Sequence, residues 1–335
     1  MIPQGKSEAV TRGMREAFGV NAFEDIRELS GGPGINPVFR IVVQGSPFLL
    51  RFNMRAGDVA RHFTCMKAAA EAGLAPRVWY TSVEDRLSIT DFIQAARFPV
   101  EGALQRMPAV LRSLHALPSF PTAPDHINTS CTFLLNKNAA VDAIIQKCRT
   151  ANVLPENGTE ELLARYKQIA AVYRRHDADM VSSHNDLFKP DNVLFDGQRV
   201  WLVDWEASFL NDRYADLAVV ANLLADNDEE RAYLQGYFGK PPDEYQLARF
   251  FLMQQLAHIF YTMAFLMMVP AGKPIDWSQP LPEFRDFNRR FWAGDVKLAD
   301  SGTKAIYGRV HWERLSYNVR QPRYKEALQI VSAGD

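Results

Sequence analysis

The sequence contains few cysteines and no excess of charge of either sign. Its 335 residues include three cysteines, Cys65, Cys131 and Cys148, which lie far apart and form no zinc-like spacing with a histidine. An odd number of scattered cysteines argues against a disulfide framework and favours a reducing compartment. Lys and Arg total 38 against 39 Asp and Glu, without a lysine-rich block. We therefore expect no nucleic acid as the main partner.

Long hydrophobic runs are also absent. The N-terminal segment MIPQGKSEAV lacks the basic and apolar regions of a signal peptide. The longest apolar run, FYTMAFLMMVP at 260–270, is too short to cross a bilayer and is typical of a buried helix. We expect a cytoplasmic protein without membrane insertion. The oligomeric state stays open, because a monomer and a dimer would share this sequence pattern.

Several catalytic signatures are missing from the chain. It has no Gly-x-Ser-x-Gly nucleophile elbow, no His-Glu-x-x-His helix, no Walker phosphate loop and no complete Gly-x-Gly-x-x-Gly fingerprint. A hydrolase or a dehydrogenase of these kinds is therefore disfavoured. The length suffices for one large domain or two unequal lobes with a buried core.

The first ninety or so residues alternate short strand-like runs with turns. Residues 39–43 and 48–52 are predicted strands that flank a turn at 44–47, which indicates a hairpin. A helix is predicted from about Asp58 to Ala72, because Gly73 and then Pro76 follow it. Two further strands are expected at 78–80 and 86–90.

After Ile93 the pattern changes to long amphipathic helices. We predict them at 104–117, 139–150, 160–176, 215–224, 245–269 and 282–297. One strand-like hairpin interrupts this helical part, with arms at 192–195 and 200–203 and a turn at Asp196-Gly197. Polar residues at both ends of such a hairpin make it a natural place for a functional site.

The densest polar cluster is SHNDLFKPDN at 183–192, followed across the hairpin by VDWE at 203–206. Phosphoryl transfer from ATP needs a carboxylate near the attacking hydroxyl and oxygen ligands that hold Mg²⁺ against the phosphates. Asp186 is the candidate that orients or deprotonates the hydroxyl. Asn192 and Asp204, at opposite ends of two short strands, are the candidates for the metal.

With these residues the chain resembles the choline/ethanolamine kinase and aminoglycoside phosphotransferase superfamily, through HNDLFKPDN at 184–192 and LVDWE at 202–206. LRSLHALP at 111–118 and EAGLAPRVWY at 71–80 extend the resemblance more weakly. It implies an α+β, bilobal protein-kinase-like fold, with a small antiparallel-sheet lobe at 1–93 that binds nucleotide. A larger, mostly helical lobe at 94–335 would carry catalysis and substrate binding. ATP and Mg²⁺ are the implied cofactors.

The resemblance also implies a set of nucleotide-binding residues in the smaller lobe. Arg51 matches the basic strand position that contacts phosphate, and the turn SGGPGIN at 30–36 resembles the phosphate-covering loop. Glycines there let backbone amides approach phosphate oxygens. Backbone groups at the hinge TDFI would bond the adenine edge. The implied residues are Ser30, Gly31, Gly32, Asn36, Arg51, Asp91 and Ile93.

Three departures from the family pattern stand out. Asp186 and Asn192 are six positions apart rather than five, which indicates a bulge in the loop or a contribution from Asp191; we favour the bulge. His62 lies near where the family has a helix Glu that pairs with the basic strand residue. The turn at 30–36 is longer by one residue and contains an extra proline.

The acceptor is the least defined part of the prediction. The leading hypothesis is a small-molecule kinase that phosphorylates a hydroxyl of a small cationic alcohol, as choline or ethanolamine kinases do. An aminoglycoside-type antibiotic phosphotransferase and a nucleotide-binding pseudokinase without turnover remain alternatives. His184 and Glu206 are expected to support the catalytic and metal-binding residues without contacting the substrate themselves. Trp277 is a candidate for substrate contact through its aromatic face.

Overall fold

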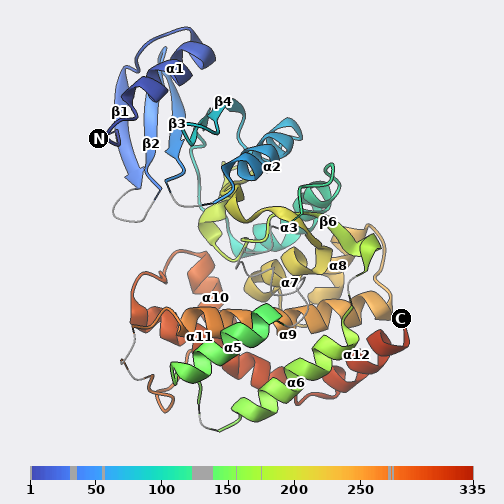
Figure 1. Ribbon diagram of the computed structural model, residues 1–335. Helices are drawn as coiled ribbons and strands as arrows, with labels where there is room; N and C mark the ends of the chain where they lie inside the picture. The colour runs from blue at the N-terminus through green and yellow to red at the C-terminus, as the bar shows by residue number, and fades with distance from the viewer. Residues whose placement is uncertain are drawn as a thin grey trace. The chain divides into compact units, whose positions relative to one another are not determined.

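The computed structural model describes residues 2–30, 36–54, 57–122, 139–155, 157–174, 176–270, 273 and 275–334. The chain packs as two compact units, which are described one at a time (Figure 1). The first unit comprises Met1–Arg97, Leu117–Pro121 and Asp191–Phe209, and the second comprises Phe98–Ala116, Thr122–Pro190 and Leu210–Asp335. The lobe boundary predicted after residue 93 stays a prediction.

A five-stranded antiparallel sheet forms the centre of the first unit, in the order β1-β2-β3-β5-β4. The strands are β1 (Asp25–Ser30), β2 (Val38–Val43), β3 (Ser46–Phe52), β4 (Val78–Ser82) and β5 (Leu87–Asp91). Gln44 and Gly45 join β2 to β3 with φ of 49° and 73°, a two-residue turn whose twist matches the hairpin. The four strands predicted from the sequence are confirmed, and β1 is additional.

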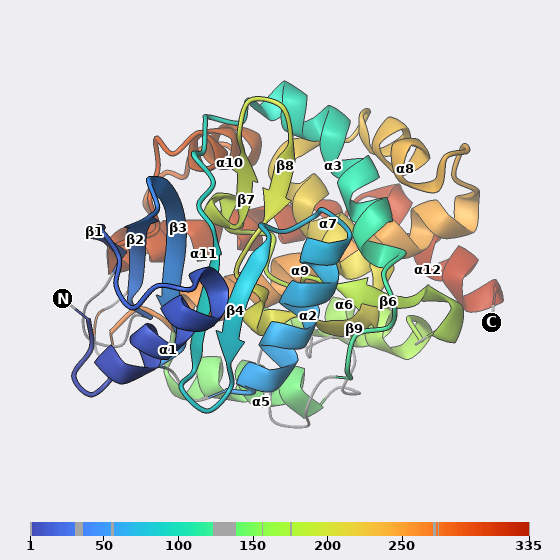
Figure 2. The ribbon, with the colours of Figure 1, turned by 90° about the horizontal axis from the view of Figure 1, so that it is seen from above.

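Two helices belong to the sheet unit. The helix predicted at 58–72 is confirmed as α2 (Val59–Glu71), and Asp58 caps it by accepting a hydrogen bond from the Arg61 amide at 2.9 Å. The sequence reading missed α1 (Ser7–Phe18), which packs against β4 and β5 (Figure 2). Its buried residues, Ala9, Val10, Gly13 and Met14, lie on one face at helical spacing, so the sequence contained a signal for this helix that was overlooked.

The hairpin predicted at 192–203 is confirmed and packs with the sheet unit. It consists of β7 (Val193–Phe195), β8 (Val200–Leu202) and the short helix η3 (Trp205–Ala207). The Leu202 amide donates to the Leu74 carbonyl at 2.8 Å, and the Ala96 amide donates to the Phe195 carbonyl at 2.6 Å. The hairpin that carries VDWE is therefore fixed to the sheet unit on two sides.

Helices make up most of the second unit. They are α3 (Val100–His115), α5 (Ala139–Thr150), α6 (Thr159–Val172), α7 (Arg213–Leu224), α8 (Glu230–Phe238), α9 (Glu244–Leu266), α10 (Phe284–Trp292), α11 (Ser301–Asn318) and α12 (Pro322–Ala333). The six helices predicted from the sequence are present; α5 has the predicted bounds, and the other five differ at one or both ends. The short elements η1 (Asp177–Asp179), β6 (Met180–Ser183), η2 (Pro190–Asn192) and β9 (Phe209–Asp212) complete the chain, and β6 pairs with β9.

The sequence reading did not anticipate α8, α11 and α12. The first two contain glycine, at Gly236 and Gly308, which is a poor helix former. Gly308 is required by packing, because a Cβ there would lie 2.9 Å from the Leu266 side chain on α9. The packing of α11 against α9, and not the helix propensity of its residues, therefore explains why a glycine is present in this helix.

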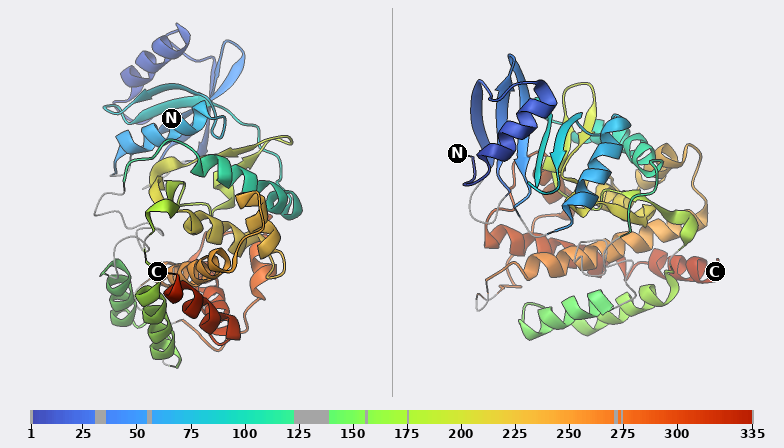
Figure 3. Two further views of the ribbon diagram at one scale, coloured as in Figure 1. Left: turned by 90° about the vertical axis from the view of Figure 1, so that its right-hand side faces the viewer. Right: turned by 45° about the horizontal axis from the view of Figure 1, so that its top comes forward.

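Helix α9 is the core of the second unit, and α7, α11 and α12 pack against it (Figure 3). It is buried on nearly all sides, so it lacks the amphipathic stripe of a surface helix. The apolar run at 260–270 is indeed mostly buried helix, although Met268 beyond its end is 53% exposed. None of the described helices is both long and apolar enough to cross a membrane.

A fully buried guanidinium, that of Arg249 on α9, binds the last residue of β9 and the short helix η1 that precedes β6. Arg249 contacts Asp212 at 2.8 Å and Asp179 at 3.3 Å, and its side chain is 0% exposed. Burial raises the pKa of Asp212, while the charge of Arg249 opposes that rise. The cation therefore keeps buried carboxyl groups compensated in the interior.

Removal of the Arg249 side chain should lower the free energy of unfolding of the second unit much more than removal of an exposed arginine. Arg249→Leu leaves buried carboxylates without their partner, and we expect a loss of about 3–5 kcal/mol in the free energy of unfolding by urea. Arg231→Leu is the matched control, because Arg231 contacts Glu244 at 2.9 Å on an exposed surface. The control should lose less than about 1 kcal/mol. Equal losses in the two variants would contradict this assignment.

A buried histidine pair joins α9 to α11. Nδ1 of His258 lies 2.8 Å from Nδ1 of His311, and the aromatic rings of Tyr261, Phe284 and Tyr307 lie close to it. Burial lowers the pKa of His258 well below its ordinary value, helped by His311 and by Arg314 and Arg285, and burial lowers the pKa of His311 to about 3. Both rings are therefore neutral in the folded protein near pH 7.

These depressed values make stability fall in acid. Below an unfolded-state pKa near 6.5 the unfolded chain binds protons that the folded pair does not, so stability is complete above that pH and is lost below it. Each histidine contributes at most about 1.4 kcal/mol per pH unit. We expect His311→Asn to reduce the slope of unfolding free energy between pH 6.5 and 4, with the exposed His176→Asn as control. An unchanged slope in His311→Asn would contradict this.

Candidate active site

The loop that carries Asp186 is held in place by the buried carboxylate of Asp216. Asp216, in the first turn of α7, accepts hydrogen bonds from the backbone amides of His184 and Asn185, both at 2.8 Å. Burial by itself raises the pKa of Asp216, and the hydrogen bond and charge of His115 together with His184 bring it below its ordinary value. Asp216 therefore stays ionised and holds the loop backbone.

Asn185 takes a strained conformation next to the candidate base. Its φ is 68°, and its side-chain oxygen accepts a hydrogen bond from Asn211 at 2.8 Å. A left-handed non-glycine residue costs about 1–3 kcal/mol and persists only where its surroundings fix it. The hydrogen bond from Asn211 therefore fixes Asn185 in this conformation, and with it the backbone position at which Asp186 begins.

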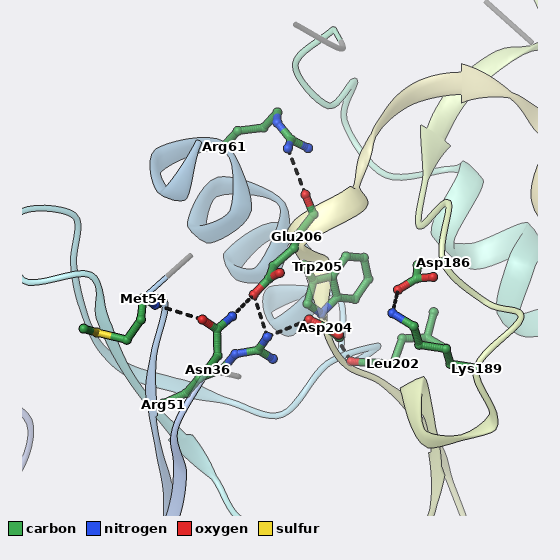
Figure 4. Close-up of polar contacts among 10 residues, drawn as sticks. All are labelled: Asn36, Arg51, Met54, Arg61, Asp186, Lys189, Leu202, Asp204, Trp205 and Glu206. Atoms are coloured by element: carbon green, nitrogen blue, oxygen red, sulfur yellow. Dashed lines mark hydrogen bonds and ion pairs between the residues drawn. The ribbon is translucent and has the colours of Figure 1, made fainter. Parts of the chain in front are cut away.

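Asp186 itself is partly accessible and paired with a cation. Its side chain is 15% exposed, and Lys189 donates to its Oδ2 at 2.6 Å (Figure 4). A carboxylate in this place can accept a hydrogen bond from a hydroxyl group or take up its proton. The sequence reading gave Lys189 no role, although its position three residues after Asp186 was visible.

Asn192 and Asp204 flank the open end of the β7–β8 hairpin in the first unit. Val193 pairs with Leu202, and the Val203 amide donates to the Asn192 carbonyl at 3.0 Å. Asp204 has a φ of 69°, a second strained non-glycine position. The spacing of twelve residues between them is thus the length of a hairpin, as the sequence predicts.

Arg51 lies between two carboxylates in the same unit. Its Nη2 donates to Oδ1 of Asp204 and to Oε1 of Glu206, each at 2.7 Å (Figure 4). Burial lowers the pKa of Arg51, but the charges of Asp204 and Glu206 outweigh it and raise the pKa above its ordinary value. The guanidinium is therefore a permanent cation at this place, and its side chain keeps 19% of its surface exposed.

Glu206 is more central than the sequence indicated. Its Oε1 also accepts a hydrogen bond from Nδ2 of Asn36 at 2.5 Å, and Asn36 accepts one from the Met54 amide at 2.8 Å (Figure 4). Three residues selected from the sequence, Asn36, Arg51 and Glu206, thus form one network. The only sequence signal for its role was the position two residues after Asp204.

Helix α2 supports this network through the backbone of the turn. Arg61 donates to the carbonyl of Glu206 at 2.8 Å and to that of Ser208, and the Cys65 thiol lies 3.7 Å from the latter oxygen. His62, where a glutamate was expected by resemblance, is buried. The helix therefore approaches the turn with a cation.

The remaining nucleotide-binding predictions lie at strand ends or outside the described residues. Ser30 is the last residue of β1, while Gly31 and Gly32 fall outside the residues that the structure describes. Asp91 ends β5, where its carboxylate accepts a hydrogen bond from Trp79 Nε1 at 2.7 Å. Ile93 follows two residues later and is half-buried. These roles stay predictions.

Trp277 packs within the second unit. Its ring lies 5.6 Å from that of Trp312, and the guanidinium carbon of Arg309 lies 5.7 Å from its centroid. A cation of the protein thus already lies over this ring. Substrate contact by Trp277 stays a prediction.

The donor set of the first unit suits a magnesium ion. Mg²⁺ is usually held by one or two carboxylates together with waters and substrate phosphates, and not by a full cage of protein ligands. Within the described part of the chain, no group of three or more His, Cys, Asp or Glu forms such a cage. The amide oxygen of Asn192 and the carboxylate of Asp204 fit the sparser kind of site.

Comparison with protein families gives a match to the phosphotransferase enzyme family over residues 25–251. No match is found among curated protein sequences. Among solved structures, the chain is similar to a choline/ethanolamine kinase family protein from Mesorhizobium loti, with 19% identity, a TM-score of 0.65 and coverage of 98% of this chain and 99% of that chain.

Two further solved structures have a similar fold. A choline kinase from Streptococcus pneumoniae has 14% identity and a TM-score of 0.55, with 97% and 98% of the two chains covered. A spectinomycin phosphotransferase in complex with ADP and spectinomycin has 11% identity and a TM-score of 0.56, with 90% and 98% covered. These similarities confirm the α+β, protein-kinase-like fold.

The family match spans both the sheet that carries Arg51 and the segments that carry Asp186, Asn192 and Asp204. The resemblance inferred from HNDLFKPDN and LVDWE is therefore confirmed at the level of the family. The chain belongs to the phosphotransferase enzyme family and is a small-molecule phosphotransferase.

Proposed function

We propose that the protein transfers the γ-phosphoryl group of ATP, with Mg²⁺, to a hydroxyl of a small cationic alcohol of the choline or ethanolamine type. The observation that carries the proposal is a partly accessible Asp186 on a loop held by Asp216, followed in the sequence by two oxygen donors, Asn192 and Asp204, six and eighteen residues further along the chain. Phosphoryl transfer requires these two groups.

Each residue has a role in a direct in-line transfer. Asp186 would accept the proton of the acceptor hydroxyl or orient that hydroxyl toward the phosphorus. Asn192 and Asp204 would hold Mg²⁺, which neutralises phosphate charge when it is bound. Arg51, a permanent cation, would contact the phosphate oxygens, because guanidinium groups match phosphate geometry. Positioning and electrostatics supply most of the acceleration in such a reaction.

The surroundings of the nucleotide would come from the sheet unit. Backbone groups at Asp91 and Ile93 are the candidates for the adenine edge. The segment with Ser30, Gly31 and Gly32 would cover the phosphates, and Asn36, six residues after Ser30, is bonded to Glu206. Similar solved structures include a phosphotransferase with bound ADP, which supports a nucleotide in this role.

A cationic acceptor is favoured by an aromatic side chain close to Asp186 in the sequence. Phe188, two residues after Asp186, is half-buried and packs against Tyr261 and Phe265, with ring centroids 5.1 and 5.8 Å away. Phe265 in turn contacts Tyr307 at 4.7 Å. Aromatic faces attract quaternary or primary ammonium groups. Tyr261, Phe265 and Tyr307 are buried, so the half-buried ring of Phe188 is the face of this cluster that remains for a small organic cation. Lys189 Nζ lies 5.5 Å from the centroid of that ring, where the acceptor's ammonium group would take its place. The charged group bonded to Asp186 is a lysine, whose repulsion grows with the charge of the acceptor and so disfavours a polycationic aminoglycoside more than a singly charged alcohol.

Binding of Mg²⁺-ATP and of the acceptor should each raise the melting temperature. Ligands that bind only the folded state stabilise it by mass action. We expect a rise with Mg²⁺-ATP and a further rise with choline or ethanolamine added to a non-hydrolysable ATP analogue, with spectinomycin as the comparison acceptor. A response to ATP without any acceptor that is phosphorylated would favour a pseudokinase, and a response only to spectinomycin would favour the antibiotic-type enzyme. No response to Mg²⁺-ATP would refute the nucleotide-dependent function.

Substitution of Asp186 and substitution of Asp204 should impair the reaction in different ways. Asp186→Asn removes the proton acceptor, and we expect kcat to fall about 10²–10⁴-fold. Asp204→Asn removes the negative charge of a metal ligand, although an amide oxygen remains, and should be at least as damaging, with a higher Mg²⁺ requirement. Asp286→Asn is the control, because Asp286 lies exposed on α10, 3.8 Å from Arg290. Near-normal turnover in Asp204→Asn would sink the metal assignment.

A further inference from the structure

The cluster around Arg51 holds more negative than positive charge. Asp204 and Glu206 contribute two negative charges and Arg51 one positive charge, a net charge of −1 (−2 + 1). One nitrogen, Nη2, bonds both carboxylates at 2.7 Å. If Asp204 turns toward a metal ion, Glu206 is left as the carboxylate that holds the guanidinium.

Of the two carboxylates, Glu206 is fixed at both ends. Its side chain accepts from Asn36 at 2.5 Å, and Asn36 is itself bonded to the Met54 amide at 2.8 Å. Its backbone carbonyl accepts from Arg61 of α2 at 2.8 Å. A carboxylate held in this way cannot follow a ligand without breaking several hydrogen bonds. Glu206 is therefore suited to fix another side chain.

Helix α2 does not offer a carboxylate for this purpose. In its sequence VARHFTCMKAAAE the single acid is Glu71, the last residue, which is exposed. The side chain that α2 sends to the turn is Arg61, and it binds backbone oxygens. The partner of Arg51 thus comes from the turn after β8.

We propose that Glu206 is the positioning residue for Arg51, and that it keeps the guanidinium directed at the nucleotide phosphates while Asp204 binds the metal. This inference rests on the proposed function. Through Asn36 the same carboxylate connects Arg51 to the segment that precedes β2. A single glutamate two residues after the metal ligand would thus set the position of the cation and of Asn36.

The role through Arg51 differs measurably from a role as a metal ligand. A group that acts through Arg51 affects nucleotide binding equally with and without Mg²⁺, and its effect disappears once Arg51 is gone. A metal ligand affects binding only when Mg²⁺ is present. The effect on Arg51 should appear mainly in nucleotide affinity and KM for ATP, with a smaller effect on kcat.

The test is a double-mutant cycle read by ADP binding, once in EDTA and once with Mg²⁺. We expect Glu206→Gln to weaken ADP binding about tenfold under both conditions, and Arg51→Met to weaken it at least as much. The double variant should be no weaker than Arg51→Met alone. Glu206→Asp, which keeps the charge, should recover part of the affinity, and Glu71→Gln on the exposed end of α2 is the control.

Three results would overturn the inference. Additive losses in the double variant, or a loss in Glu206→Gln that appears only with Mg²⁺, would show that Glu206 does not act through Arg51. Unchanged ADP binding in Glu206→Gln would show that it does not act at all. Failure of the unaltered protein to bind ADP or ATP would instead remove the proposed function, and this inference with it. Circular dichroism of each variant separates loss of binding from loss of fold.

Discussion

The hydrogen bonds from Asp216 to the amides of His184 and Asn185 determine where Asp186 can be. A general base must be held within hydrogen-bond reach of its substrate, and a surface loop alone does not provide that precision. Asp216 lies at the start of α7, is almost fully buried, and also contacts His115. The helical unit therefore fixes the loop from its interior, while Asp186 stays partly accessible and Lys189 is exposed.

The sheet unit also holds its candidate site residues by hydrogen bonds, but there the supporting groups are donors and not a carboxylate. There the carboxylates are at the partly exposed end, and buried or half-buried donors hold them: Arg51 and Asn36 on the side chains and Arg61 on the backbone. The strained φ of Asp204 is retained because β7 and β8 and these donors fix the turn. In both units, strain at one non-glycine residue is balanced by hydrogen bonds from neighbouring segments.

Motifs could be read from the sequence because they depend on local spacing. The hairpin from Asn192 to Asp204 and the helix after Asp58 follow from turn and capping residues, and the structure contains both. The network around Glu206 could not be read in this way, because Asn36, Arg51 and Glu206 are separated by up to 170 residues. Helix α11 was missed because its reason is the close packing of Gly308 on α9. Pairing across such distances is a property of the fold and leaves no local pattern.

The central claim is that this phosphotransferase moves a phosphoryl group from ATP to a small cationic alcohol, with Asp186 accepting the proton. Phosphorus NMR of a mixture of the protein, Mg²⁺, ATP and choline or ethanolamine tests it most directly, because product and nucleotide give separate signals. We predict a growing phosphomonoester signal matched by ADP, and none with Asp186→Asn. Release of inorganic phosphate alone, or an unchanged ATP spectrum, would contradict the claim.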